Sequence, residues 1–260
     1  MRIGELEVIP VSDGTCKMPP QYFVNADYSG HEGLFGPDGT IECQIGCFVV
    51  RNGDMTVLVD AGIGPFDNPV FQGGKLPSEL EAAGVSRDEI DMVVCTHLHL
   101  DHTGWLVRDE QRFFPRATVR FGAPDWEHFV VNGKSGDMVK DEFELLAAAG
   151  CLRPIESDGE TIAPGITARA APGHTLGHYC LVLSSGDERA VLLGDAIACP
   201  VQLQEPEWSA ISDVDPALAV RTRETLFREL EGTDDVAVAS HFPELTFGRV
   251  LRGNGKRYWS

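Results

Sequence analysis

Short apolar runs bounded by turn residues recur along most of the chain and predict β-strands. They lie at 45–50, 55–60, 91–96, 118–121, 166–170, 179–184, 190–194 and 236–240. Arg51-Asn52-Gly53-Asp54 separates the first two runs, and an Asn-Gly pair between apolar runs is typical of a β-hairpin. Ser185-Gly186-Asp187 predicts a second hairpin by the same reasoning.

Helical patterns alternate with these strands, at 78–83, 124–131, 138–149 and 217–230. The last of them has the clearest start, because Asp215 can cap the helix and Pro216 suits its first turn. Gly232 follows its end. Strands interleaved with helices predict an α/β fold with sheet in the middle and helices outside.

Residues 12–44 do not follow this pattern. The segment is rich in Gly, Pro and aromatic residues, including Tyr22, Phe23 and Tyr28. A long loop inside a compact fold is usually a lid, a binding loop or an arm packed on its own aromatics, and these readings stay open here. We expect one domain over residues 1–260 with an insertion or lid loop at 12–44.

Composition and charge narrow the class of protein. With 43% hydrophobic and 23% charged residues, the chain has the makeup of an ordinary globular domain. Its 40 acidic and 21 basic residues give a net charge of −19, which disfavours nucleic acid and anionic membranes as partners. We therefore expect a small-molecule substrate.

The absence of certain segments and motifs from the sequence predicts where the protein is located and the redox state of its cysteines. It has no apolar run near the roughly 20 residues of a membrane helix, and its first residues do not resemble a signal peptide. Its seven cysteines are scattered without a CxxC pair, so we expect reduced thiols. These features predict a cytoplasmic protein.

Four potential metal ligands, His97, His99, Asp101 and His102, directly follow the predicted strand 91–96. In extended backbone, alternate side chains point the same way, so His97 and His99 can face one point. Asp101 and His102, which follow where the chain should turn into a helix, can face a second point a few ångströms away. Burying these groups without partners costs several kcal/mol, which favours a metal site over simple packing.

Three further residues share this position at the end of a predicted strand. His174 follows the strand 166–170, Asp195 follows 190–194 and His241 follows 236–240. Ligands of layered α/β proteins gather at strand ends. We therefore expect these side chains to lie at one shared edge with His97–His102.

The motif HxHxDH, followed in order by His, Asp and His, resembles the metallo-β-lactamase superfamily. Leu58-Val59-Asp60-Ala61-Gly62 is similar to the early strand motif of that family. The resemblance extends from about residue 45 to about residue 250. It implies a four-layer αβ/βα sandwich, with two mixed sheets between outer helices and a two-metal site in the cleft between the sheets.

The resemblance also implies roles for individual residues. The implied ligands are His97, His99 and His174 for one metal, Asp101, His102 and His241 for the other, and Asp195 as a bridge. Imidazole with carboxylate is typical of zinc, although manganese or iron also accepts it. Asp60 is expected to orient a ligand imidazole, with a strand-end turn role as the alternative. His178 is expected to be a structural hydrogen-bonding residue.

These roles imply hydrolysis by a hydroxide held between two metals, with Asp101 or Asp195 passing a proton to the leaving group. An ester or lactone is the expected substrate, because Asp213-Val214-Asp215-Pro216 and Ser240-His241-Phe242-Pro243 resemble the branch with lactonases and organophosphate hydrolases. The alternatives are a phosphotriester or phosphodiester hydrolase, a mononuclear-iron sulfur dioxygenase and a non-catalytic metal-binding module. The complete second ligand set favours two metals.

Two features bear on the substrate and the assembly. Acyl-homoserine lactonases typically carry a Tyr three residues after the bridging Asp, where this chain has Ala198, so quorum-signal lactones are disfavoured. An aromatic substrate pocket is expected from Tyr22, Phe23, Trp126, Phe129 and Trp208, with core packing as the alternative for each. A homodimer that exchanges the 12–44 arm is compatible with the sequence.

Overall fold

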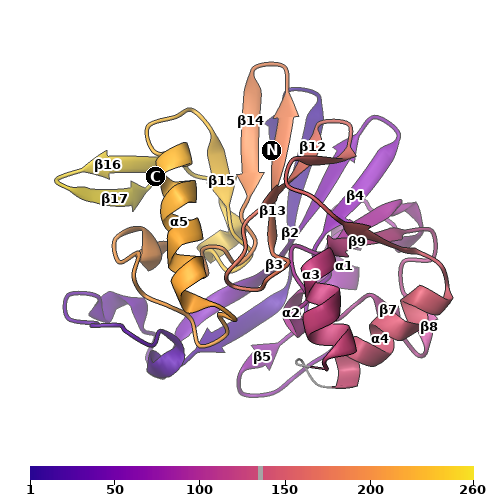
Figure 1. Ribbon diagram of the computed structural model, residues 1–260, viewed down its shortest axis with the longest axis horizontal. Coiled ribbons are helices and arrows are strands. Elements are labelled where there is room, and N and C mark those ends of the chain that lie inside the picture. The colour runs from indigo at the N-terminus through magenta and orange to yellow at the C-terminus, as the bar shows by residue number, and fades with distance from the viewer. Residues whose placement is uncertain (134–136) are drawn as a thin grey trace.

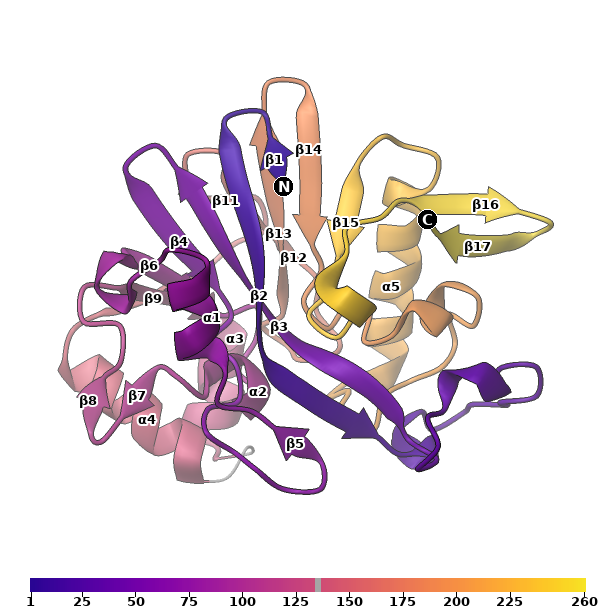
Figure 2. The same ribbon diagram turned by 180° about the vertical axis from the view of Figure 1, so that it is seen from behind.

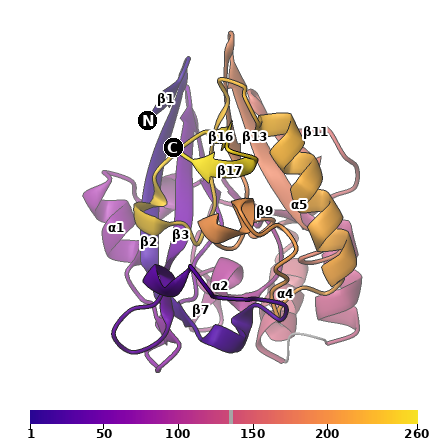
Figure 3. The same ribbon diagram turned by 90° about the vertical axis from the view of Figure 1, so that its left-hand side faces the viewer.

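Two β-sheets lie face to face in the computed structural model, which describes residues 1–133 and 137–260. Helices α1 (Leu76–Ala82), α3 (Ala123–Asp125) and α4 (Asp137–Ala148) cover the outer side of the larger sheet, and α5 (Pro216–Leu230) covers the outer side of the smaller one (Figures 1 and 2). Figure 3 shows α1 and α5 on opposite sides of the two sheets. This arrangement confirms the predicted four-layer αβ/βα sandwich. Among the described residues, each helix is too short or too polar to span a lipid bilayer.

The larger sheet has the strand order β1-β2-β3-β4-β6-β9-β10, with β5 on β2, and the smaller has the order β11-β12-β13-β14-β15. The strands of the larger sheet are β1 (Arg2–Ile3), β2 (Leu6–Met18), β3 (Ile41–Asn52), β4 (Met55–Val59), β5 (Phe71–Gln72), β6 (Met92–Val94), β9 (Thr118–Gly122) and β10 (Leu152–Ile155). Those of the smaller sheet are β11 (Glu160–Ala163), β12 (Ile166–Ala170), β13 (Tyr179–Ser185), β14 (Glu188–Leu192) and β15 (Val236–Val238). Two separate hairpins are β7 (Val107–Arg108) with β8 (Gln111–Arg112), and β16 (Val250–Gly253) with β17 (Lys256–Trp259).

The α-helices are α1 (Leu76–Ala82), α2 (Leu100–Thr103), α3 (Ala123–Asp125), α4 (Asp137–Ala148) and α5 (Pro216–Leu230). A π-helical turn, Trp126–Val131, continues α3. Short 3-10 turns lie at Pro20–Tyr22, Glu32–Leu34, Arg87–Glu89, Pro200–Leu203 and Pro243–Leu245. Asp215 caps α5 as predicted, because its carboxylate accepts the backbone N–H of Leu218 at 2.9 Å.

The strands alternate between two cores, as the period of two requires. On β3, Val49 packs toward α1 and α4, whereas its neighbours Phe48 and Val50 enter the core between the sheets. On β13, Leu181 enters that same inter-sheet core, and Val182 packs in the core that contains residues of α5. The apolar material is thus buried on both faces of each sheet, which leaves the strand ends for the chemistry.

Parallel pairing brings distant chain segments to a common edge. Strands β4 and β6 are parallel in the larger sheet, and β14 and β15 are parallel in the smaller one. The carboxyl ends of these strands lead directly to Asp60, His97, Asp195 and His241. The shared edge expected from the sequence is therefore present.

The structure corrects the prediction of one loop over 12–44. Strands β2 and β3 pair antiparallel from Glu7 opposite Arg51 to Met18 opposite Ile41, so 12–18 and 41–44 are strand and only 19–40 is the connecting arm. Glycine content was part of the loop prediction, and one of these glycines, Gly14, lies inside β2. Its φ of 146° lies at a β-bulge that shifts the register of β2 without ending the strand.

Candidate metal centre

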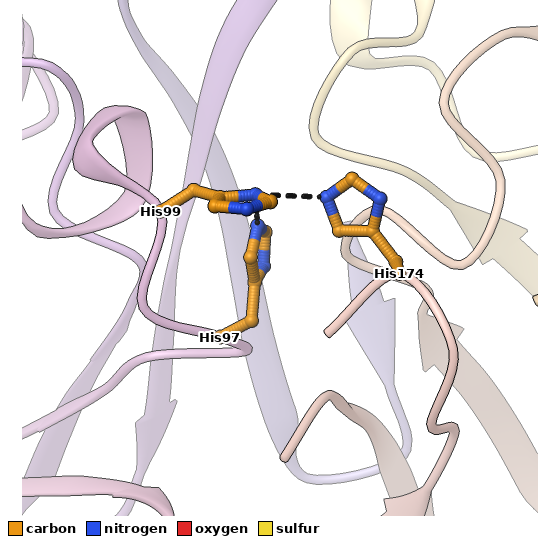
Figure 4. A group of neighbouring side chains, drawn as sticks. All are labelled: His97, His99 and His174. Carbon is orange, nitrogen blue, oxygen red and sulfur yellow. Dashed lines mark hydrogen bonds between the residues drawn. The ribbon is translucent and has the colours of Figure 1, made fainter. Parts of the chain in front are cut away.

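The first group of ligand atoms comes from the loop after β6 and the loop after β12. His99 Nδ1 lies 2.9 Å from His97 Nε2 and 3.0 Å from His174 Nε2. Figure 4 shows the three rings converging from the two sheets. These three imidazole nitrogens lie close enough together to bind one metal ion.

The second group comes from α2 and the end of β15. Asp101 Oδ2 lies 3.4 Å from His241 Nε2 and 3.8 Å from His102 Nε2. One ligand atom from each of Asp101, His102 and His241 falls within 4.8 Å of the others, as it does for the first group. The structure therefore brings both predicted triads together.

Asp195 lies between the two triads. Its Oδ2 is 3.4 Å from His174 Nε2 and 3.1 Å from His241 Nε2, and its Oδ1 is 3.5 Å from His102 Nε2. Because Oδ2 also lies 4.0 Å from His97 Nε2, this single carboxylate faces two nitrogens of each triad. All seven residues singled out in the sequence meet at this point.

The outer ring nitrogens of three histidines are held by hydrogen-bond acceptors. The Nδ1–H of His102 donates to Asp60 Oδ2 at 2.8 Å, and that of His174 donates to Asp213 Oδ1 at 2.9 Å. The Nδ1–H of His241 donates to the backbone carbonyl oxygen of residue 44 at 2.6 Å. A proton on Nδ1 leaves the lone pair on Nε2, which is the atom that faces the cluster. These contacts select the tautomer that a metal requires.

Asp60 holds more than the His102 ring. Its Oδ1 accepts the backbone N–H of Thr96 at 2.7 Å, and the Thr96 hydroxyl donates to the same carboxylate at 3.0 Å. The backbone of Asp60 has a φ of 61°, in the left-handed region that side chains rarely adopt. The carboxylate at the end of β4 therefore fixes both the start of the ligand loop and one ligand ring.

Burial sets the charge states of the cluster. It lowers the pKa of His97 well below the ordinary value and that of His99 to about 3, with neighbouring imidazoles acting in the same direction. Burial also disfavours the ionised form of Asp195, but the opposite charges of His241 and His102 outweigh it and lower the pKa of this carboxyl. Burial disfavours the charged forms of His102 and His241, but the surrounding carboxylates outweigh it and raise the pKa of both rings well above the ordinary value, so these two rings hold protons that a metal ion would displace on binding.

Two buried polar atoms show that these residues fit divalent cations. His102 Nε2 and Asp195 Oδ1 have no hydrogen-bond partner within residues 1–133 and 137–260. Leaving such atoms unsatisfied costs about 1–3 kcal/mol each, and a cation between them removes that cost. Imidazole nitrogen and carboxylate oxygen are donors suited to zinc, and also to manganese or iron.

Two supporting carboxylates escaped the sequence analysis. Asp213 holds His174, and Asp125 accepts the backbone N–H groups of Leu98 and Gly177 at 3.1 and 2.6 Å. Asp125 thereby ties the loop of His97 and His99 to the loop of His174. The motif at 213–216 was noticed only as a family likeness, and no local signal marked Asp125.

His178 lies beside the cluster without joining it. Its Nε2 accepts the backbone N–H of Asp195 at 2.9 Å, and burial lowers its pKa to about 3. The prediction of a structural hydrogen-bonding role is confirmed.

A cavity of about 500 Å³ opens onto the cluster. His99, Asp101, Asp195 and His241 line it together with Tyr22, Ser212 and mostly apolar side chains. The cavity gives a small molecule access to both triads.

The predicted aromatic pocket is wrong for four of its five members. The rings of Phe23 and Trp208 pack on each other at 5.7 Å and are 2% and 4% exposed, so they belong to the core. Trp126 packs against Phe121 at 5.9 Å and lines a separate hollow. Phe129 is buried with its ring 5.4 Å from His99, so Tyr22 is the one predicted pocket residue of the five that lines the cavity.

Comparisons with known proteins agree with this geometry. A family model described as the metallo-beta-lactamase superfamily matches residues 40–241. AidC, a dizinc quorum-quenching lactonase in complex with a product, superposes with a TM-score of 0.88 at 22% identity, over 100% of this chain and 95% of that one. The chain belongs to the metallo-β-lactamase superfamily, as the sequence motifs predicted.

Curated relatives are similar at low identity. An N-acyl homoserine lactonase of Bacillus sp is 24% identical over 200 residues, which are 66% of this chain and 73% of that protein. Acyl-coenzyme A thioesterase MBLAC2 of Homo sapiens is 25% identical over 79% of this chain and 75% of that protein. A shorter match, 42% identical over 69 residues, covers only 10% of transcription termination factor FttA of Cenarchaeum symbiosum (strain A). The chain is thus a superfamily hydrolase homologous to lactonases.

Proposed function

We propose that the protein is a dinuclear metal-dependent hydrolase, with zinc as the metal, that cleaves an ester or lactone bond of a small molecule. The observation that carries this proposal is the position of Asp195, whose two oxygens face His174 of one triad and His102 of the other. A carboxylate placed in this way is suited to hold two cations close together. The lactonase relatives support the choice of an ester or lactone.

When bound, the cations would lower the pKa of a water molecule and polarise the oxygen of a substrate carbonyl. His97, His99 and His174 would hold one cation and Asp101, His102 and His241 the other. Asp101 also has a second role in this proposal. Its side chain is 17% exposed and lines the cavity, so its carboxylate can take up a proton and release it to the leaving group.

The charges of the cavity support a neutral substrate. Lys17 is the only Lys or Arg side chain among the described residues that line it, and its ammonium pairs with Asp38 at 2.5 Å. Apart from the proposed metal ions, the part of the wall that the structure describes offers no further cationic side chain to a substrate with several phosphate groups, such as an acyl-coenzyme A. Neutral phosphotriesters are the main alternative, because they meet the same requirement.

The test measures metal content and turnover on the same preparation. We expect about two zinc ions per chain, hydrolysis of neutral lactones or aryl esters, loss of turnover with a chelator and recovery on adding zinc or manganese. Faster turnover of phosphotriesters than of all carboxylic esters would favour the alternative. One iron per chain with thiol-dependent oxygen consumption, or full metal content with no turnover on either class, would contradict the proposal.

A further inference from the structure

The arm at 19–40 is fastened beside the metal centre and is not a free lid. The backbone N–H of Ile211 donates to the carbonyl of Tyr22 at 2.8 Å, and that of Val24 donates to the carbonyl of Ser209 at 2.8 Å. Phe23 forms a β-bridge with Ala210 between these two bonds. This short ladder fixes the backbone of Tyr22 against the segment 209–212.

The ladder places two hydroxyl groups together in the cavity wall. Tyr22 Oη and Ser212 Oγ lie 3.2 Å apart, and both residues line the cavity that contains Asp101, Asp195 and His241. Burial and the neighbouring carboxylates raise the pKa of the Tyr22 phenol, so it keeps its proton. When Ser212 donates to the phenol oxygen, the phenol proton is free to donate to a third group.

The remaining walls offer little other hydrogen bonding. Apart from the proposed ligands and this pair, Cys16 and Lys17 are the lining side chains in residues 1–133 and 137–260 that carry an N–H, O–H or S–H donor. The ammonium of Lys17 is paired with Asp38, and a thiol is a weak donor. The rest of the lining is apolar, from Met18, Pro19, Val70, Phe71, Leu100 and Ile211.

We propose that Tyr22, positioned by Ser212, donates a hydrogen bond from its Oη–H to an oxygen of the bound ester or lactone, and that the arm at 19–40 thereby completes the active site. This inference rests on the proposed function. It assigns the polar end of the substrate to the hydroxyl pair and the apolar remainder to the surrounding walls.

The test compares Tyr22→Phe with Tyr28→Phe in the zinc-loaded protein. Tyr28 belongs to the same arm, but its hydroxyl donates to the carbonyl of Pro20 at 2.8 Å and it does not line the cavity. Tyr22→Phe keeps the ring that packs edge-on against Phe23, so the fold and metal content should stay unchanged. We expect its kcat/KM to fall about ten- to hundredfold, mainly through kcat, with little change for Tyr28→Phe.

Two further measurements separate donation to substrate from a purely structural clasp. Ser212→Ala removes the positioning contact but keeps the phenol, so its loss in kcat/KM should be smaller than that of Tyr22→Phe. An alkyl-substituted γ-lactam, which resists hydrolysis, should bind Tyr22→Phe several-fold more weakly in calorimetry. Equal losses of kcat/KM in Tyr22→Phe and Ser212→Ala, with a lowered Tm in both, would show that the hydroxyl pair has only a structural role and would overturn the inference.

The outcomes also separate this inference from the proposed function. An inactive wild-type protein with full metal content contradicts the function itself. An active wild type whose Tyr22→Phe variant keeps the same kcat, KM and lactam affinity contradicts only the role of Tyr22.

Discussion

Replacing Asp213 by Asn tests how the centre holds its metal from outside the ligand set. Asp213 Oδ1 accepts the Nδ1–H of His174 at 2.9 Å, and its Oδ2 accepts the backbone N–H of Ala210 at 3.0 Å. Asn has nearly the same size, and its oxygen can still accept a hydrogen bond from the imidazole, although its amide nitrogen cannot accept the backbone N–H of Ala210. The change therefore removes the negative charge while it keeps the shape of the site.

The expected effect follows from the loss of that charge. A carboxylate behind a ligand imidazole raises the basicity of the ring, and removing such a partner typically weakens metal binding about 10–100-fold. This corresponds to about 1.4–2.7 kcal/mol of binding free energy. The fold should survive, because Arg223, which lies near Asp213, also donates to the backbone carbonyls of Ala196, Pro206 and Trp208.

The matched control is Asp215→Asn. Asp215 lies two residues further on and caps α5, where Asn is as good a cap as Asp. It removes the same charge without touching His174. Zinc affinity is measured by competition with a chromophoric chelator, and metal content by elemental analysis.

We expect weaker zinc binding for Asp213→Asn and wild-type binding for Asp215→Asn, with similar unfolding of both metal-free proteins. Affinities within twofold for wild type and Asp213→Asn would refute the reasoning. Equal weakening in both variants would show that net charge matters and not the contact with His174.

Two further predictions address the second triad and the stability. His102→Ala should lower the metal content from about two to about one per chain and reduce turnover at least a hundredfold, while the far-ultraviolet circular dichroism is unchanged; unaltered metal content would contradict the ligand assignment. Burial raises the pKa of Glu142 to about 8, and Glu142 Oε2 lacks a partner among the described residues. A raised folded pKa favours folding at low pH, and this contribution is lost as the pH rises from about 4.5 through about 8. Glu142→Gln should therefore raise the free energy of unfolding at pH 9 by about 1–3 kcal/mol but not at pH 4, and the exposed Glu144→Gln should not; urea titrations check this, and equal effects would exclude the mechanism.

Most strands and helices could be predicted from the sequence because their signals are local. The hairpin turn at Asn52-Gly53 joins β3 and β4 as expected, and Asp215 begins α5. The ligand loop at His97–His102 was recognisable for the same reason, since the motif lies within six residues after a strand. Local backbone preferences and the alternation of apolar residues act over a few positions, so they can be recognised in a short stretch of sequence.

The contacts that support the ligands were not predictable in this way. Asp125 accepts a hydrogen bond from the backbone N–H of Gly177, which lies 52 residues further along the chain. Asp213 accepts one from the ring of His174, which lies 39 residues before it. Either aspartate taken alone reads as an ordinary polar residue near a helix. Only the packing of the two sheets decides which carboxylate meets which ring.

The sequence by itself thus determined where the strands end and which potential metal ligands follow them, from His97 to His241. The tertiary structure decided the surroundings: that 12–18 and 41–44 are strand, that Trp208 is core, and that Tyr22 reaches the cavity beside Ser212. The physical reason is that side-chain burial depends on which segments pack together. That choice depends on contacts over the whole molecule and is not contained in any short stretch of sequence.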